Sequence, residues 1–552
     1  MLLLLLFFVS FLSSVRTSAI LFANLWNSRS HAGTVLPLAQ RLVQRGHNVT
    51  IYTPVLRSFG KLEGVNTVEA TMPDSYDRSL EAVIFKDVIW HSDYTPFKLR
   101  FAFEIGGAYV EHVWNLESFQ NVRNHKWDLV IANEMLATPA FSIALDQNRR
   151  FGAKVAMYTT TANESEKKRQ AGEIRRHMEH NLDVLSFYYL RHKKCRYSPG
   201  DFFDRVETAV DLLMEYYILE HLSAFWMAKT LSLFGIAHFE WSDIYNETQL
   251  TFSDYPDRYS WPTTVSNQMV YTGAFCTEVG RVPEDLEAFM SDSTKKGLIY
   301  VAFGSMVVDA FFEMFRHFPD YIFIFSFKLK GYPVEKAGPN VKVLSWAPQR
   351  EIIAHKRTVL FFTHGGLKSL KEAICAETPL LVLPFFADQI PNAVNMRHLG
   401  FAESLIKTEL STEVMVAQIR KMVTNRAYKE KIKKIKAIFV DRVMDPQEEG
   451  VFWTERILRS SRGLTFPIRG STMTYVEILN LDVLALASLT LPLLLWRLLE
   501  GRPLEQLALQ LLWEWEYGII SSGASSCYTG EALILFWAGQ ILCSSSVFWW
   551  QR

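Results

Sequence analysis

The sequence predicts an α/β protein with two doubly wound domains in tandem. Short apolar, strand-like runs alternate with helix-like stretches, and this alternation occurs in two separate series. The chain has 552 residues, which is more than a single hydrophobic core organises. Basic and acidic residues number 58 each, so the net charge favours no polyanion, and we expect no nucleic-acid partner.

The N-terminal residues 1–18 have the pattern of a cleaved secretory signal, because an apolar run of about a dozen residues is followed by small residues. Five cysteines, widely spaced and odd in number, predict neither a metal cluster nor a dense disulfide framework. Among the sequons, Asn163 and Asn246 are the expected glycosylation sites, whereas Asn48 opens a strand expected to be buried.

The first predicted domain, residues 19–265, begins with a strand, helix and second strand, “AILFANL”, “TVLPLAQRLVQRG” and “HNVTIYTP”. The helix has one apolar face and Gly46 as its stop, and a βαβ unit of this kind implies a parallel sheet. “WDLVIAN” and “AKVAMYTT” are further inner strands, and the pattern of residues 160–260 is mostly helical. “SWPTTVSNQMVYTGAF” lacks periodicity and is interpreted as the interdomain linker.

The second predicted domain, residues 266–450, contains five strand-like runs: “GLIYVAFGS”, “YIFIFSF”, “VKVLSWAPQ”, “VLFFTHGG” and “PLLVLPFF”. Helix-like stretches separate several of them, as in a doubly wound sheet. Two such domains in tandem are expected to enclose a cleft, with ligands at the carboxyl ends of the strands.

The C-terminal part is predicted to reach a membrane. Residues 451–480 are expected to form helices next to it, and residues 481–499 to form a transmembrane helix around the uncharged “VLALASLTLPLLLW”. Arg497 and Arg502 follow this run, which places the C-terminal side in the cytosol and the preceding domains in the lumen. Residues 500–552 form an atypical tail whose apolar run Ala532–Trp550 suits either a second span or an interfacial segment.

The motifs of nucleotide binding are absent from the sequence: there is no G-x-G-x-x-G after a strand, no G-x-x-x-x-G-K-[ST] and no D-x-D. The remaining phosphate candidate follows “VLFF”, where Thr363-His364-Gly365-Gly366 leads into a helix-like run. Backbone N–H groups at a helix start attract anions, and glycines permit a close approach. His364 and Ser369 add donors there, and Lys368 adds a formal charge.

Residues 345–400, “SWAPQREIIAHKRTVLFFTHGGLKSLKEAICAETPLLVLPFFADQIPNAVNMRHLG”, closely resemble the signature segment of the UDP-glycosyltransferases, most of all the animal UDP-glucuronosyl/glucosyltransferase group. A weaker resemblance extends from about Ala19 to Asp482. The resemblance implies the GT-B type of fold, with two facing Rossmann-like domains. The acceptor would bind to the N-terminal half and the sugar nucleotide to the C-terminal half.

The resemblance also implies a UDP-sugar site in the second domain, and no metal ion is expected in it. By this resemblance Trp346 stacks on the uracil and Gln349 contacts the uridine, roles that suit an aromatic ring and an amide. The other implied contacts are His364, Gly366 and Ser369 to the diphosphate, Gly304 and Ser305 to the phosphate from the first strand, Glu372 to the ribose, and Asp388 and Gln389 to the sugar hydroxyls.

In the first domain the family's general base aligns with His31, which takes a proton from the acceptor hydroxyl as its oxygen attacks the anomeric carbon. The family usually places a carboxylate after “WDLVIA” to orient this histidine, but here Asn133 occupies the position. An amide holds a tautomer by accepting from Nδ1–H, yet it does not neutralise an imidazolium. Glu134 and the more distant Asp128 are the alternative carboxylates.

Three further departures distinguish this chain from the family. Lys368 stands where Asn is usual, and Glu377-Thr378 stands where Gly-Val is common. The segment between “FGSMVVDA” and “YIFIFSF” leaves room only for a short crossover helix, so part of the sheet face is expected to be exposed.

The resulting hypothesis is a single-pass enzyme of the endoplasmic-reticulum membrane with lumenal catalytic domains. It would be an inverting transferase that moves glucose or glucuronic acid from UDP to a hydroxyl of a small lipophilic acceptor, as a homo- or hetero-oligomer with related transferases. The alternative is a catalytically impaired homologue that binds UDP-sugar or partner transferases without turnover, which Asn133 favours.

Overall fold

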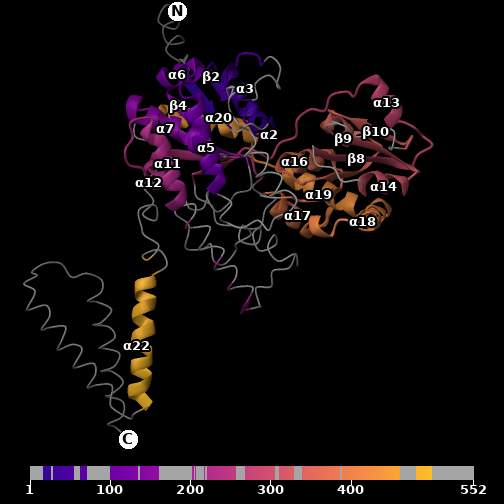
Figure 1. Cartoon of the computed structure of the whole chain (residues 1–552). Helices are drawn as coiled ribbons and strands as arrows, with labels where there is room; N and C mark the ends of the chain where they lie inside the picture. The colour runs from indigo at the N-terminus through magenta and orange to yellow at the C-terminus, as the bar shows by residue number, and fades with distance from the viewer. Residues whose placement is uncertain are drawn as a thin grey trace, which may run out of the picture. The chain divides into compact units, whose positions relative to one another are not determined.

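The computed structural model describes residues 17–25, 29–54, 62–70, 100–134, 137–160, 221–256, 268–304, 310–327, 338–385, 388–460 and 480–499, with a few isolated positions. The signal-like residues 1–16, Asn163, Ser305 and the tail 500–552 therefore lie outside the described residues. The chain divides into two compact units, Met1–Thr472 and Met473–Arg552. Both sheets belong to the first unit, each with its own helices around it (Figure 1).

The first sheet has seven parallel strands in the order β3-β2-β1-β4-β5-β6-β7. The strands are β1 (Ala19–Ala23), β2 (Asn48–Thr53), β3 (Asn66–Glu69), β4 (Leu129–Asn133), β5 (Lys154–Thr159), β6 (Thr248–Ser253) and β7 (Met269–Tyr271). Helices of this half are α2 (Arg29–Thr34), α3 (Leu36–Gln44), α5 (Arg100–Val113), α6 (Glu117–Asn124), α7 (Ala137–Phe151), α11 (Ser223–Ser232) and α12 (Trp241–Glu247). The predicted βαβ start is confirmed, while β7 lies inside the stretch expected to be a linker.

Alternation along the inner strands separates two cores. Leu21 of β1 and Val130 of β4 pack into one core with α5, α7 and α11, whereas their neighbours Ile20 and Leu129 pack into another with α3. A strand buried on both faces reads as a continuous apolar run, which is why the sequence identified these strands. The order reverses where β1 lies between β2 and β4, so ligands are expected beyond the carboxyl ends of β1 and β4.

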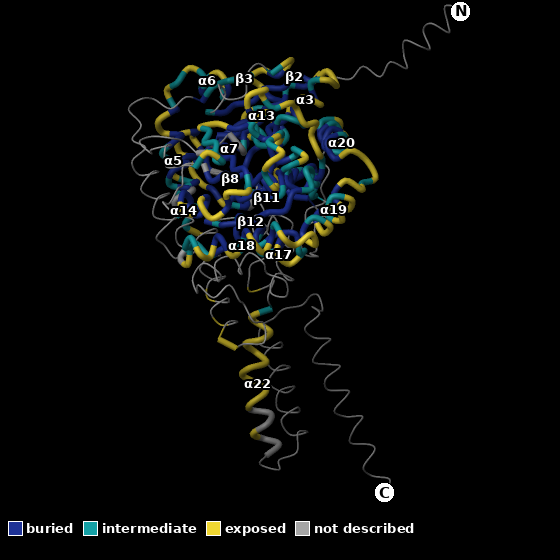
Figure 2. Tube along the Cα trace, turned by 90° about the vertical axis from the view of Figure 1, so that its right-hand side faces the viewer, coloured by how far each residue is buried: buried dark blue, intermediate teal, exposed yellow. Residues whose placement is uncertain are grey.

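The second sheet has six parallel strands in the order β10-β9-β8-β11-β12-β13. They are β8 (Gly297–Gly304), β9 (Tyr321–Phe327), β10 (Val341–Leu344), β11 (Thr358–Thr363), β12 (Leu380–Val382) and β13 (Ala402–Ser404). Its helices are α13 (Glu284–Met290), α14 (Ala310–Arg316), α15 (Gln349–Ala354), α16 (Leu367–Ala376), α17 (Gln389–His398), α18 (Thr412–Thr424) and α19 (Ala427–Val440), with a 3-10 turn at Lys407–Glu409. Figure 2 shows β8, β11 and β12 buried and the outward faces of α17, α18 and α19 exposed. All five predicted strands are confirmed.

The crossover between β8 and β9 corrects one expectation. α14 is indeed short, with seven residues, but the sheet beneath it is not exposed, since Phe323 and Phe325 have no accessible surface. The helix covers this face with large rings: Phe311 stacks on Phe325 at 6.1 Å and Phe315 lies 4.8 Å from Phe323. Aromatic side chains bury so much area each that two turns of helix suffice here.

A further helix, α20 (Pro446–Arg459), packs on the first sheet's half although it follows the second sheet in the sequence. Arg41 of α3 and Arg45, the C-cap residue of that helix, pair with Glu448 at 3.1 and 2.6 Å. Lys154 at the start of β5 donates to the carbonyls of Ile457, Leu458 and Ser460. An ammonium group at these last carbonyls caps the C-terminal end of α20 and fixes it to the sheet.

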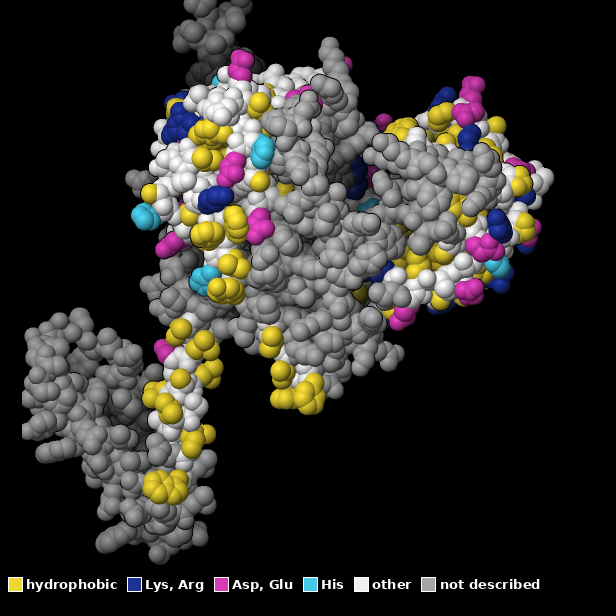
Figure 3. Space-filling view, in the orientation of Figure 1, with side chains coloured by type: hydrophobic (Ala, Val, Ile, Leu, Met, Phe, Trp, Pro, Cys, Tyr) yellow, Lys and Arg dark blue, Asp and Glu magenta, His cyan; other side chains and the backbone are white. Residues whose placement is uncertain are grey.

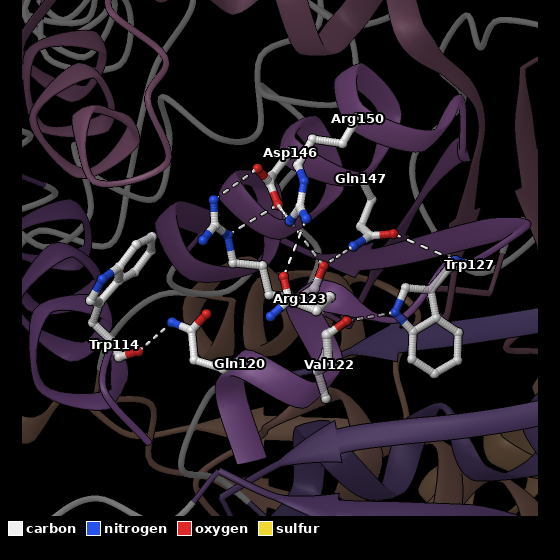
Figure 4. Close-up of polar contacts among 9 residues, drawn as sticks. Trp114, Gln120, Val122, Arg123, Trp127, Asp146, Gln147 and Arg150 are labelled. Atoms are coloured by element: carbon white, nitrogen blue, oxygen red, sulfur yellow. Dashed lines mark hydrogen bonds and ion pairs between the residues drawn. The ribbon is translucent and has the colours of Figure 1, made fainter. Parts of the chain in front are cut away.

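Helices α6 and α7 are held together by a charged cluster (Figure 4). The Asp146 carboxylate, which is 2% exposed, accepts from Arg123 at 3.3 Å and from Arg150 at 3.2 Å. Gln147 adds a hydrogen bond to the Arg123 carbonyl, and the Arg123 guanidinium lies 4.8 Å from the ring of Trp114. A buried carboxylate with two guanidinium partners is compensated for its loss of water.

A disulfide, Cys276–Cys375, joins the segment after β7 to α16. The count and spacing of the cysteines gave no basis for this pair, because its two members are 99 residues apart. Among the residues that the structure describes, no group of His, Cys, Asp and Glu is arranged to hold a metal ion.

The expectation of a transmembrane helix at residues 481–499 is corrected by the structure. Residues Leu481–Leu499 do form a helix, α22, and its described part carries exposed hydrophobic side chains such as Leu484, Leu486 and Leu489 (Figure 3). Within the described part of the chain, however, no helix has the length and apolar character that crossing a membrane requires. Asp482 in its first turn and Pro492 inside it interrupt the apolar run, as does Arg497 near its end.

Candidate functional site

The candidate site begins where β11 passes into α16, in a turn that needs bare glycine backbone. Gly365 has φ +83°, and a Cβ there would lie 2.5 Å from Cγ1 of Val382. A Cβ on Gly366 would lie 2.8 Å from Nε2 of His364. Gly366 is the N-cap of this ten-residue helix and has no side chain to accept from it, while the Leu367 N–H in the first turn hydrogen-bonds to the Asp388 carboxylate. Such a turn accommodates an anion on the helix start.

Buried polar atoms without a partner among the described residues surround the same turn. They are Oγ1 of Thr363, Nδ1 of His364 and Oδ1 of Asn392. Asn392 also donates from Nδ2 to the Gly365 carbonyl at 3.1 Å and to Asp388 Oδ2 at 3.0 Å. Buried groups of this kind are costly unless they are paired, so they fit a polar ligand such as a diphosphate with its sugar. Burial lowers the pKa of His364 to about 4, so its ring is neutral at neutral pH.

The residues assigned to the uridine lie together at the start of α15 and on α16. Gln349 donates from Nε2 to Glu372 Oε2 at 2.7 Å and to Ser369 Oγ at 3.3 Å. Burial raises the pKa of Glu372, and the hydrogen bond from Gln349 opposes that effect. Trp346 precedes α15 with 62% of its surface exposed, so its ring face is available for stacking.

Gln389 begins α17, and Asp388 is the N-cap residue of that helix. The pKa of Asp388 is raised to about 6, chiefly by burial and to a lesser extent by the nearby charge of Glu134, while hydrogen bonds from the Leu367 N–H and from Asn392 oppose the rise. Gln389 accepts the Phe385 N–H on Oε1 at 2.9 Å, so its side chain also shapes the loop that precedes it. Gly304 ends β8 beside β11, which is the position where the strand order of this sheet reverses.

His31 lies in α2, directly after β1, at the corresponding position of the first sheet. Its Nδ1 lies 2.5 Å from Thr160 Oγ1. Burial lowers its pKa to about 4, so at neutral pH the imidazole is uncharged and able to take up a proton.

Of the three residues expected as partners of His31, which are Asn133, Glu134 and Asp128, Glu134 is connected to it through Thr160. Asn133 donates from Nδ2 to the Tyr158 carbonyl at 3.3 Å, inside the sheet. Asp128 accepts from the Ala19 N–H at 2.8 Å, at the amino ends of β1 and β4, which excludes it as a neighbour of His31. Glu134 instead accepts from the Thr160 N–H at 2.7 Å and thereby reaches the residue that contacts His31.

Thr160 and Asn392 are the two site residues that the sequence analysis missed. Thr160 follows the last residue of β5, and the carboxyl ends of parallel strands are where ligand-binding side chains gather. Asn392 is four residues after Asp388 on one helix, which brings their side chains together. Both residues could therefore have been predicted from their positions at a strand end and one helical turn after Asp388.

Comparisons with known proteins agree with this geometry. A family model described as “UDP-glucoronosyl and UDP-glucosyl transferase” matches residues 25–494. The chain is 32% identical over 247 residues to a UDP-glucuronosyltransferase of Pleuronectes platessa, covering 43% of this chain and 52% of that protein. It is 26% identical over 500 residues to UDP-glycosyltransferase UGT5 of Dactylopius coccus, covering 86% and 90% of the two chains. UDP-glucuronosyltransferase 1A7 of Homo sapiens is 23% identical over 470 residues, which cover 82% and 86%.

Solved structures show the same fold at lower identity. The crystal structure of the glycosyltransferase VinC in complex with dTDP superposes with a TM-score of 0.52 and 16% identity, over 79% of this chain and 99% of that one. The glycotransferase of kitacinnamycin gives a TM-score of 0.51 and 18% identity, over 80% and 99%. Two parallel-sheet, Rossmann-like domains of the GT-B type are thus the architecture of this chain.

Proposed function

Because the chain belongs to the UDP-glucoronosyl and UDP-glucosyl transferase family, we propose that it is an inverting transferase that moves glucose or glucuronic acid from UDP to a hydroxyl of a small lipophilic acceptor. One observation carries the proposal. A neutral, half-buried imidazole, His31, follows β1 where the first strand order reverses, and the bare glycine turn of α16 follows β11 where the second reverses. Base and phosphate cradle thus occupy the position at which open α/β sheets bind ligands.

In the proposed reaction, His31 Nε2 removes the proton of the acceptor hydroxyl while the acceptor oxygen attacks the anomeric carbon. The bond from that carbon to the β-phosphate oxygen breaks, and attack from the opposite face inverts the centre. UDP leaves with its negative charge at the start of α16, where the positive end of the helix dipole stabilises it. Trp346 and Gln349 hold the uridine, Glu372 the ribose, and Asp388 with Gln389 the sugar.

The experiment is an assay of the full chain with labelled UDP-glucose or UDP-glucuronic acid and a panel of lipophilic alcohols and phenols, without added metal. Turnover that His31→Ala reduces by at least about 10²-fold, with unchanged UDP affinity, supports the proposal. Turnover that is equal in wild type and His31→Ala overturns the role of His31. Absence of both turnover and UDP binding overturns the function itself.

A second candidate is a homologue that binds UDP-sugar without turnover. The observation in its favour is Asn133, because the family's carboxylate position here carries an amide that donates to the Tyr158 carbonyl. This candidate predicts UDP binding by calorimetry, no glycosyl transfer by the wild type, and transfer gained by Asn133→Asp. Association with related transferases, measured by co-purification, would then be its activity.

We further propose that the chain enters the secretory pathway and works in the lumen of the endoplasmic reticulum. Residues 1–18 have the composition of a signal, and a disulfide such as Cys276–Cys375 persists in oxidising compartments. Asn246 is exposed near the end of α12, and Asn48 is exposed at the first position of β2, whose other residues are buried as expected. A mass shift on endoglycosidase treatment that Asn246→Gln reduces would support lumenal exposure, and full sensitivity to protease added outside intact microsomes would contradict it.

A further inference from the structure

The arrangement around His31 contains a carboxylate that the family comparison does not assign. Glu134 is 9% exposed and Asn133 is 1% exposed, and they are adjacent at the carboxyl end of β4. Resting on the proposed role of His31 as general base, we propose that Glu134, acting through the Thr160 hydroxyl, is the positioning carboxylate of this site. It sets the tautomer of His31 and stabilises the imidazolium, in place of the family's carboxylate, whose position Asn133 occupies.

The Thr160 hydroxyl has one proton, and this determines which atom donates and which accepts in its contacts with Glu134 and His31. Glu134 Oε1 accepts the Thr160 N–H at 2.7 Å and lies 3.4 Å from Thr160 Oγ1, which donates toward it. A hydroxyl has a single proton, so once this proton points to the carboxylate, Oγ1 meets His31 as an acceptor. The His31 atom at 2.5 Å from Oγ1 is Nδ1, which must therefore carry the proton. Nε2 is left with its lone pair and serves as the basic nitrogen.

The end of the β4–β5 ladder explains why Glu134 takes this place. Asn133 pairs with Tyr158 in the register of the two strands, and its amide donates to the Tyr158 carbonyl. The backbone N–H of Glu134 donates to the same carbonyl at 3.4 Å, which positions Glu134 beside the residues that end β5. Thr160 comes directly after that strand. Asn133 thus occupies the family's carboxylate position in the ladder, and the next residue, Glu134, brings a carboxylate to the same end of the strand.

The proton balance requires no transfer through Thr160. When His31 Nε2 takes the acceptor proton, Nδ1–H remains in place, Thr160 keeps its hydroxyl proton and Glu134 stays ionised. The carboxylate acts by its charge and by orienting the hydroxyl dipole toward the new imidazolium. Other titratable groups near Glu134 are Asp388 at the N-cap of α17, whose pKa Glu134 raises, and Tyr158 of β5, whose pKa is raised by burial and also by Asp254.

Three variants of the full chain test the arrangement kinetically. Thr160→Val and Glu134→Gln should each lower kcat by roughly 10- to 10³-fold with unchanged UDP affinity, and Thr160→Ser should restore most of the activity of Thr160→Val. Loss of the Glu134 charge disfavours the imidazolium, so the acid limb of the kcat/KM profile should move to lower pH in Glu134→Gln. Asp128→Asn removes a carboxylate at the opposite end of β4 and should leave kcat and the profile unchanged.

A second measurement is independent of turnover. Nitrogen-15 spectra of the histidine-labelled chain, with His31 assigned through His31→Gln, should show the Nδ1–H tautomer in the wild type and a mixture in Thr160→Val. This result in an inactive protein would support the proposal while the proposed function fails. An Nε2–H tautomer in the wild type, or full activity and an unshifted pH profile in both Thr160→Val and Glu134→Gln, would overturn it.

Discussion

Lys371 of α16 and Asp254, which directly follows β6, form an ion pair of 2.6 Å between Nζ and Oδ1. The two side chains are only 11% and 4% exposed. The Lys371 ammonium also lies 5.0 Å from the ring of Phe275. The helix that carries the phosphate cradle is thereby joined to the carboxyl end of the first sheet, so the pair relates the two halves of the site.

Lys371→Met should destabilise the protein by about 3–5 kcal/mol, because it leaves a buried carboxylate without its cationic partner. Chemical denaturation measures the change in unfolding free energy. Lys368→Met is the matched control, since Lys368 is exposed on the same helix, and its effect should stay within about 0.5 kcal/mol. The double variant Lys371→Met/Asp254→Asn should recover much of the loss. Equal losses from Lys368→Met and Lys371→Met would contradict the importance of the buried pair.

Gly365→Ala should weaken UDP binding at least about 10-fold, since the added Cβ collides with Val382 and displaces the turn before α16. Isothermal calorimetry with UDP measures the change. Gly46→Ala is the control, because Gly46 has φ +88° but no atom within 4 Å of its would-be Cβ. That variant has a conformational cost of about 1–2 kcal/mol in stability without a change in UDP affinity. Unaltered UDP affinity in Gly365→Ala would exclude this turn as the phosphate site.

Glu377→Gly should stabilise the protein by about 0.5–1 kcal/mol. Glu377 ends α16 with φ +57°, a left-handed conformation that costs about 1–2 kcal/mol for a residue with a Cβ, and the family commonly has Gly at this position. Its ion pair with Lys436, 3.0 Å long and partly exposed, offsets less than about 1 kcal/mol of that strain. Thermal unfolding checks the gain, and Glu377→Gln, which keeps the strain and loses the pair, should instead be slightly less stable than the wild type.

These examples also indicate what the sequence was able to predict. The inner strands are continuous apolar runs buried on both faces, so β1, β4, β8 and β11 and the residues at their carboxyl ends were identifiable. The short strands β3, β7 and β13 were missed because three or four residues give no periodicity, and β6 was missed because it lies in the stretch expected to be mostly helical. The contact of Thr160 with His31 depends on which strands are neighbours, since 129 positions separate the two residues. The same holds for the return of α20 to the first sheet, which is a tertiary contact.

Removal of the disulfide should lower stability by up to about 4–5 kcal/mol, because Cys276 and Cys375 close a loop of 99 residues in the unfolded chain. The double variant Cys276→Ala/Cys375→Ala and reductant-treated wild type should unfold at the same, lowered temperature. Reductant should then have no further effect on the variant. A wild type whose thermal unfolding is the same with and without reductant would contradict the bond's contribution.

The acid sensitivity of folding should depend on His364, whose pKa burial lowers to about 4 from an ordinary value of 6.5. Above pH 6.5 the ring is neutral in both the folded and the unfolded chain and contributes nothing. As the pH falls from 6.5 to 4, the unfolded chain binds the proton first, so stability falls, and the loss is complete below pH 4.

His364→Gln removes this loss, and relative to the wild type it should gain up to about 3 kcal/mol between pH 7 and pH 4. His31 likewise lowers the stability as the pH falls, whereas Asp388 raises it. Both residues remain in the variant, so their contributions cancel in the difference between the two proteins. Urea unfolding of the two proteins at a series of pH values measures it, and a difference that does not change with pH would show that His364 is not buried as a neutral ring.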